Sequence, residues 1–121
     1  MYREELPEGC PPPDAIEIEN EWIGYRFVSG TSPAPEDFDS HFRKDPSKRY
    51  PDPCIAKALS LEADFAQARK RLELPKFKNG SICQVTLDRG AGRIKQTGAS
   101  RTHYSWWPYN GWGVIECSRI V

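Results

Sequence analysis

Alternating hydrophobic and polar positions mark the clearest strand of the chain. Over residues 21–28, Ile23, Tyr25 and Phe27 would share one face of an extended segment. The residues of the opposite face would be Trp22, Gly24, Arg26 and Val28. Residues 82–87 alternate in the same way. Further strands are predicted for residues 93–97, 104–107 and 112–120.

Two other segments have the features of helices. Residues 35–44 begin with Pro-Glu-Asp and place Phe38 and Phe42 about one turn apart, which predicts a short helix. In the second segment Ser60 is the predicted N-cap, and Pro75 ends the helix. Its apolar stripe consists of Leu61, Phe65, Ala68 and Leu72. Residues 54–61 are too few to decide between a strand and a helical turn.

This order of elements predicts an α+β domain. A strand, two helices and then several strands favour a mainly antiparallel sheet with two helices packed against it, and the sheet could be split or strongly curved. Residues 1–20 contain four prolines among acidic residues, so we expect an extended arm there. Residues 21–121 then form the single domain.

Composition is that of a globular protein. Of the 121 residues, 38% are hydrophobic and 28% are charged. No apolar run approaches the roughly 20 residues that span a bilayer, and residues 1–8 do not have the pattern of a signal peptide. We therefore expect a cytoplasmic protein without a membrane partner.

The zero net charge conceals an asymmetry along the chain. Residues 1–64 carry 14 acidic and 7 basic side chains, whereas residues 65–121 carry 3 acidic and 10 basic ones. A basic half can bind the phosphates of a nucleotide or a nucleic acid. The alternative, in which the two halves face each other and their charges compensate, is slightly favoured. Nucleic acid is therefore the less favoured partner.

The four cysteines are widely spaced along the chain. They are Cys10, Cys54, Cys83 and Cys117, with no Cys-x-x-Cys pair among them. We expect buried free thiols, because the chain has no export signal. A zinc site and a cysteine nucleophile are less favoured alternatives, and the sequence leaves the thiol or disulfide state open.

Aromatic residues concentrate between His103 and Trp112. The segment reads His-Tyr-Ser-Trp-Trp-Pro-Tyr-Asn-Gly-Trp and holds three of the four tryptophans. Such a segment is either the packed end of a core or the wall of a site. His103 could act as a general base, contact a nucleotide or bind the backbone. An exposed Trp106, Trp107 and Trp112 would instead suit a protein-interaction or inhibitor module. With the basic residues of 69–101 on the same face, they would suit single-stranded nucleic acid.

Three dispersed residues have the chemistry of a nucleotide site. Arg26, in the middle of a strand, could hold a phosphate with its planar guanidinium. Ser60, just before the predicted helix, could order that arginine or a ribose. Glu116, in the last predicted strand, could bind ribose hydroxyls and stabilise an oxocarbenium-like transition state.

The order Arg26, Ser60, Glu116 resembles the layout of the ADP-ribosyltransferase-like fold. The resemblance implies NAD as ligand, those three residues as the catalytic set, and a site wall from nearby aromatic residues and a histidine. The wall would comprise Tyr25, His103, Tyr104, Trp106 and Trp107. The chain lacks a Ser-Thr-Ser motif at Ser60 and a Gln/Glu-x-Glu motif at Glu116.

A second resemblance covers most of the chain. The segments Tyr-Arg-Phe-Val, Glu-Asp-Phe-Asp-Ser-His-Phe, Ala-Leu-Ser-Leu and His-Tyr-Ser-Trp-Trp-Pro are similar to those of a family of small uncharacterised bacterial proteins. That resemblance implies no activity. The leading functional hypothesis is therefore an NAD- or nucleotide-binding domain, with the protein-interaction module and the single-strand binder as alternatives.

Overall fold

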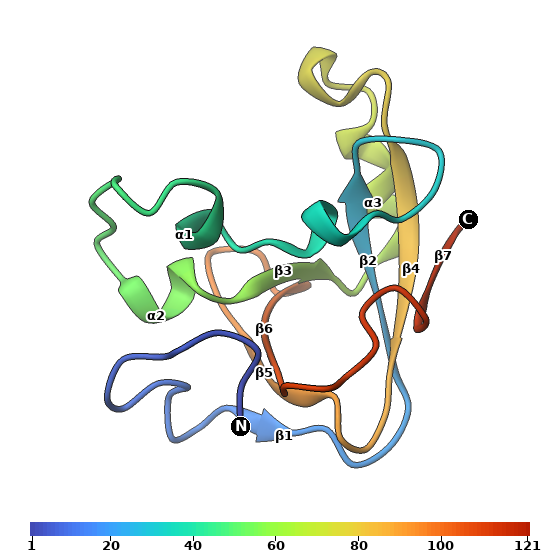
Figure 1. Cartoon of the computed structure of the whole chain (residues 1–121). Helices are drawn as coiled ribbons and strands as arrows, with labels where there is room; N and C mark the ends of the chain where they lie inside the picture. Colours follow the sequence, from blue (N-terminus) through green and yellow to red (C-terminus); the bar gives the residue numbers. More distant parts are fainter.

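The computed structural model describes all residues, 1–121, as one open antiparallel sheet with short helices around it (Figure 1). The strands follow the order β1-β5-β6-β3-β2-β4-β7. They are β1 (Ile16–Glu17), β2 (Trp22–Val28), β3 (Leu59–Glu62), β4 (Ser81–Leu87), β5 (Gly92–Gln96), β6 (His103–Pro108) and β7 (Ser118–Ile120). The helices are α1 (His41–Lys44), α2 (Pro53–Ala56) and α3 (Phe65–Arg71), with 3-10 turns η1 (Pro35–Phe38) and η2 (Pro75–Phe77). The predicted α+β class with a mainly antiparallel sheet is confirmed.

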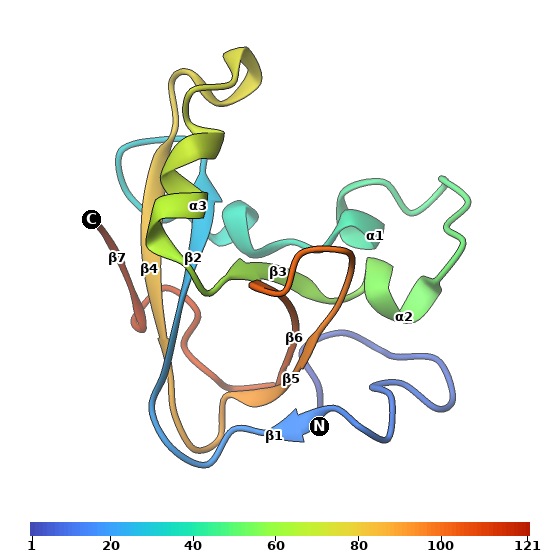
Figure 2. The same ribbon diagram turned by 180° about the vertical axis from the view of Figure 1, so that it is seen from behind.

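The interior strand β2 is paired very unequally with its two neighbours, β4 and β3. With β4 it pairs along its whole length, from Trp22 opposite Leu87 to Val28 opposite Ser81. With β3 it pairs only at Tyr25 and Glu62. Figures 1 and 2 show β3 running at a steep angle to β2, so the two strands separate beyond this pair. The site described below lies over this separation.

The hydrophobic core lies against one face of the sheet, as the alternation in β2 and β4 requires. Its fully buried members include Val28, Leu61, Val85, Leu87 and Trp106. The opposite face is partly covered by α3, which contacts β2 and β3 and buries Ala68. Each face of the sheet is thus shielded by different segments.

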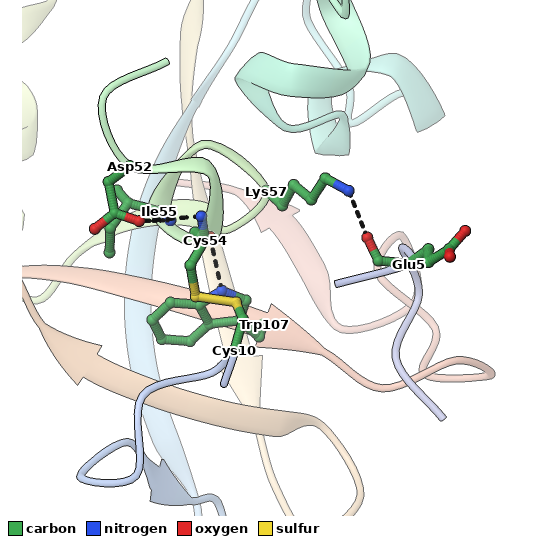
Figure 3. Close-up of a disulfide and its surroundings, with 7 residues drawn as sticks. All are labelled: Glu5, Cys10, Asp52, Cys54, Ile55, Lys57 and Trp107. Atoms are coloured by element: carbon green, nitrogen blue, oxygen red, sulfur yellow. Dashed lines mark hydrogen bonds between the residues drawn. A yellow bond between two sulfur atoms is a disulfide. The ribbon is translucent and has the colours of Figure 1, made fainter. Parts of the chain in front are cut away.

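The N-terminal arm is fastened to the domain at several points. It ends in β1, which pairs with β5 at the sheet edge. A disulfide joins Cys10 to Cys54 of α2, and the Lys57 ammonium donates to the Glu5 carbonyl oxygen at 2.7 Å (Figure 3). The Asp52 carboxylate caps α2 by accepting from the Cys54 and Ile55 amides.

The disulfide corrects our expectation for the cysteines. Cys10 and Cys54 are joined, whereas Cys83 and Cys117 are free thiols. A pairing across 44 residues cannot be read from spacing, because it depends on where the arm lies. Disulfides persist mainly in oxidising compartments, so this bond weighs against the cytoplasmic assignment, which stays a prediction. None of the helices combines the length and the apolar character that crossing a membrane requires.

Three predicted elements differ from the structure in their bounds. The helix expected from Ser60 is instead strand β3 followed by α3, with Asp64 as the N-cap. The helix over 35–44 is divided into η1 and α1, because Ser40 caps a new turn. Within 112–120 only β7 is a strand, and the Cys117 amide donates to the Gly113 carbonyl in a turn before it.

Candidate functional site

A cleft of about 220 Å³ opens where β2 and β3 separate. Its floor comes from these two strands, one wall from α3 and η2, and the other from the segment that includes α1. The polar and charged side chains of its lining include Tyr25, Arg26, His41, Lys44, Ser60, Glu62 and Arg71. The cleft forms because β2 and β3 pair at only one position, so beyond that pair side chains line the space between the two strands.

Arg26 lies at the base of the cleft and bridges its sides. Its Nε donates to the Asp37 carbonyl oxygen at 2.8 Å, and its Nη1 donates to the Ser60 carbonyl oxygen at 2.8 Å. A guanidinium has five N–H donors in a planar fork, so three remain after these bonds. Nη2 makes no hydrogen bond within the protein and is not sealed from solvent. Arg26 can therefore brace the fold and still bind an anion.

The charge of Arg26 has no carboxylate partner. The protein contains three salt bridges, and none of them includes Arg26. Burial lowers the pKa of Arg26 to about 10, against the opposing effect of Asp37, so the guanidinium remains charged at neutral pH. The guanidinium is partly exposed and is influenced by the Asp37 carboxylate without a salt bridge to it, so an anionic ligand in the cleft would be its direct charge partner.

Three further basic groups surround the cleft. Lys44 and Arg71 line it from opposite walls, and neither forms a salt bridge. His41 lies on the α1 wall, where partial burial followed by the charges of Lys44 and Arg26 lowers its pKa. The neutral form of His41 is therefore favoured beside these cations.

Two carboxylates also line the cleft, and both have other partners. Asp39 lies 3.9 Å from the Arg43 Nε. Glu62 is buried, with 5% of its surface exposed, and its Oε2 accepts from the Asp64 amide at 3.1 Å. The cleft thus combines an excess of positive charge with one carboxylate held deep inside it.

Aromatic rings form the apolar side of the cleft. Phe27 and Phe77 pack with ring centroids 4.4 Å apart, and Tyr25 packs against Phe65 at 5.1 Å. Tyr25, Phe27 and Phe77 all line the cleft. Rings beside cations are the features that bind a phosphate joined to a planar base.

The segment between β2 and α1 is locked in place by its own polar groups. The Asp37 carboxylate accepts from the amides of Ser29 and Ala34 at 3.1 and 2.9 Å. The Ser40 hydroxyl, buried at 1% exposure, accepts from the Arg43 amide and begins α1. These bonds position His41 and Lys44 at the cleft.

The structure brings together two of the three predicted catalytic residues. Arg26 and Ser60 share the cleft, where Ser60 stands on β3 and not at a helix N-terminus. Glu116 is exposed in the turn before β7 and lines a separate shallow depression with Trp112 and Arg119. The carboxylate that accompanies Arg26 and Ser60 is Glu62.

The predicted wall residues are divided between the cleft and the core. Tyr25 lines the cleft. The His103 Nδ1 lies 3.1 Å from the Thr97 carbonyl oxygen, and Tyr104 packs on Trp22 with centroids 5.1 Å apart. Neither His103 nor Tyr104 lines the cleft.

Trp106 and Trp107 are packing residues. They are 0% and 1% exposed, and their Nε1 atoms donate to the Ala91 and Cys54 carbonyl oxygens at 3.0 Å. Because successive side chains of a strand point to opposite faces of the sheet, Trp106 and Trp107 pack into different hydrophobic clusters. Neither lines the cleft that contains Arg26, and neither is exposed enough to form a surface patch, so both support the fold.

Sequence reasoning missed Glu62, His41 and Lys44 as site residues. The signal for Glu62 was present, because Leu59-Ser60-Leu61-Glu62 alternates with a period of two and so predicts a strand with Ser60 and Glu62 on one face. His41 and Lys44 carry no comparable local signal. Their place depends on how the segment between β2 and β3 folds back over the sheet.

Comparison with protein-family models, with curated proteins and with solved structures finds no match for this chain.

Proposed function

We propose that the chain is a nucleotide-binding domain whose ligand is a dinucleotide such as NAD. The observation that carries the proposal is the Arg26 guanidinium, which forms no salt bridge and lies in the cleft with Lys44, Arg71 and aromatic side chains. In this proposal Arg26 binds one phosphate, and Lys44 and Arg71 bind the pyrophosphate from either wall.

The size of the cleft limits how much of the ligand it encloses. Its volume of about 220 Å³ lies below the roughly 300–1,000 Å³ of sites that enclose drug-sized ligands. A dinucleotide would therefore place one nucleoside inside, against Tyr25 or Phe27, and extend the other across the mouth. The exposed Arg71 and Lys44 are the groups at that mouth.

As chemistry we propose glycosyl transfer from NAD of the ADP-ribosyltransferase-like kind. The bond between the ribose C1′ and the nicotinamide nitrogen breaks, and nicotinamide leaves as the neutral base. A nucleophile, which can be water, forms the new bond to C1′ and loses its proton to solvent. A carboxylate near C1′ stabilises the positive charge that develops there. Glu62 takes this role in place of Glu116, because it is the buried carboxylate that shares the cleft with Arg26 and Ser60.

The test uses NAD with two matched carboxamide variants. Calorimetry measures NAD binding, and nicotinamide release measures the reaction, for the wild type, Glu62→Gln and Glu116→Gln. We expect the wild type to bind NAD, Glu62→Gln to lose 10²-fold or more of any turnover, on the order seen when one transition-state contact is removed, and Glu116→Gln to retain it. Absence of NAD binding refutes the proposed function. Binding with equal turnover in all three proteins refutes the role of Glu62.

A further inference from the structure

A second basic surface lies outside the cleft, on α3 and η2. Residues 69–78 contain five basic side chains and one acidic side chain. The basic residues are Arg69, Lys70, Arg71, Lys76 and Lys78, and all five are exposed. We call these five residues together with Phe65 and Phe77 the α3–η2 surface.

None of these five cations is neutralised within the protein. The salt bridges of the chain join Arg43 to Asp39, Arg93 to Glu17 and Lys95 to Asp14. Two of these bridges, those of Arg93 and Lys95, join a basic residue of 65–121 to an acidic residue of 1–64, as the expected charge compensation between the two halves requires. The other cations of the basic half without a salt bridge, Arg89, Arg101 and Arg119, are far apart in the sequence, whereas these five lie within ten residues.

Aromatic rings alternate with the cations on this surface. The Arg69 guanidinium lies 5.8 Å from the centroid of Phe65, and the Lys76 ammonium lies 4.9 Å from that of Phe77. Phe65 is 37% exposed, although the ring is large and apolar. Cations that follow a phosphate chain, interleaved with rings on which bases stack, are the common features of single-strand binding surfaces.

The position of the surface leaves it open to a long ligand. Figures 1 and 2 show the segment after α3 projecting beyond the ends of β2 and β4. Arg71 and Phe77 also line the cleft, so the surface continues to the cleft mouth. A chain of phosphates could follow α3 and η2 without meeting another part of the domain.

We propose that the α3–η2 surface binds single-stranded nucleic acid. The basic residues contact successive phosphates, and the exposed part of Phe65 stacks on a base. An acidic protein segment would satisfy the cations but would not use Phe65 as a stacking platform, which is why nucleic acid is favoured. The inference does not require the cleft to bind NAD.

The test compares two triple variants that lose the same charge. Lys70→Gln/Lys76→Gln/Lys78→Gln alters the α3–η2 surface, and Arg49→Gln/Arg89→Gln/Arg101→Gln alters exposed basic residues elsewhere. Fluorescence anisotropy follows binding of a labelled oligodeoxythymidine or oligouridine of about 16 nucleotides, the upper end of common site sizes. A labelled polyglutamate serves as the acidic polypeptide.

The proposal predicts a specific set of outcomes. The wild type binds the oligonucleotide. A plot of log binding constant against log salt concentration is shallower for the α3–η2 triple variant by about 2, because each of the three lost phosphate contacts contributes roughly 0.7 to the slope. The control triple variant binds as the wild type does. Phe65→Leu weakens strand binding and leaves polyglutamate binding unchanged.

Three results would overturn the proposal: no strand binding at low salt, equal weakening in both triple variants, or polyglutamate binding as tight as strand binding. Arg26→Lys separates this proposal from the proposed function, because it should lower NAD affinity while leaving strand affinity unchanged.

Discussion

The Arg26 Nη1 donates to the Ser60 carbonyl oxygen at 2.8 Å across the point where β2 and β3 separate. This bond replaces the ladder hydrogen bonds that a continuous sheet would have there. It places a cation, with unused donors, at the base of a cleft between two strands. One residue thus joins the architecture of the sheet to the chemistry proposed for the site.

Replacing Arg26 by lysine should affect stability and binding together. A lysine ammonium is a point charge without the planar fork, so it cannot bridge the Asp37 and Ser60 carbonyls in the same way. We expect a loss of about 1.5–3 kcal/mol in the free energy of unfolding, the range for one hydrogen bond to a charged group. Urea denaturation measures it. An unchanged midpoint would show that the bridge contributes nothing to the fold.

The disulfide should be a main source of stability for the arm. Cys10→Ser/Cys54→Ser removes a cross-link between residues 44 apart, and loss of such a bond commonly costs about 2–5 kcal/mol. Thermal unfolding of the oxidised wild type and the double variant measures the difference. Cys117→Ser is the control, because Cys117 is a free thiol, and a reductant should lower the wild-type midpoint but not that of the double variant. A reductant effect in the double variant would contradict this assignment.

His41 should couple ligand binding to proton uptake. Its pKa is lowered from 6.5 by burial and by the charges of Lys44 and Arg26, so its protonated form is disfavoured in the folded protein. Stability contributed by the neutral form should therefore fall as pH decreases through 6.5. An anion in the cleft offsets the neighbouring charges and raises the pKa.

Binding of ADP-ribose, which has no phosphate monoester, should then strengthen between pH 7.5 and pH 5.5, around the ordinary histidine pKa of about 6.5. Calorimetry in buffers of different ionisation enthalpy detects the proton uptake. His41→Gln should abolish the uptake. Equal uptake in the variant would rule out His41 as its source.

Two tryptophans should respond differently to the same substitution. The Trp106 Nε1 donates to the Ala91 carbonyl oxygen at 3.0 Å, whereas the Trp112 Nε1 is buried without a partner. Trp106→Phe removes one of the two hydrogen bonds that the Ala91 carbonyl oxygen accepts, the other coming from the Tyr109 amide, whereas Trp112→Phe removes a donor that is already unsatisfied. We expect Trp106→Phe to cost about 1 kcal/mol more, as measured by denaturant unfolding. Equal costs would mean that ring volume alone governs both sites.

The sequence predicted the strands better than the site because strand periodicity is local. Residues 21–28 and 82–87 alternate clearly and became β2 and β4. Arg26 and Ser60 were both identified from their residue types, and the topology brings them together. Ser60 was assigned to a helix because its neighbours Glu62 and Asp64 also suit a first turn.

The remaining parts of the site depend on long-range packing. Glu116 precedes the last strand, but that strand pairs with β4 at the sheet edge and leaves Glu116 away from the cleft. His41 and Lys44 enter the site only because the segment after β2 folds back over the sheet. No local pattern specifies such contacts, and the same holds for the pairing of Cys10 with Cys54.

The most direct test of the central claim is where ADP-ribose binds. Two-dimensional NMR of the ¹⁵N-labelled protein, titrated with ADP-ribose, follows the backbone amides and the Arg26 Nε–H. The account predicts shifts confined to β2 around Arg26, to His41–Lys44, to Ser60–Glu62 and to α3 around Arg71, with the Arg26 Nε–H among the largest. Shifts confined to residues 112–119, or none at saturating ligand, would contradict it.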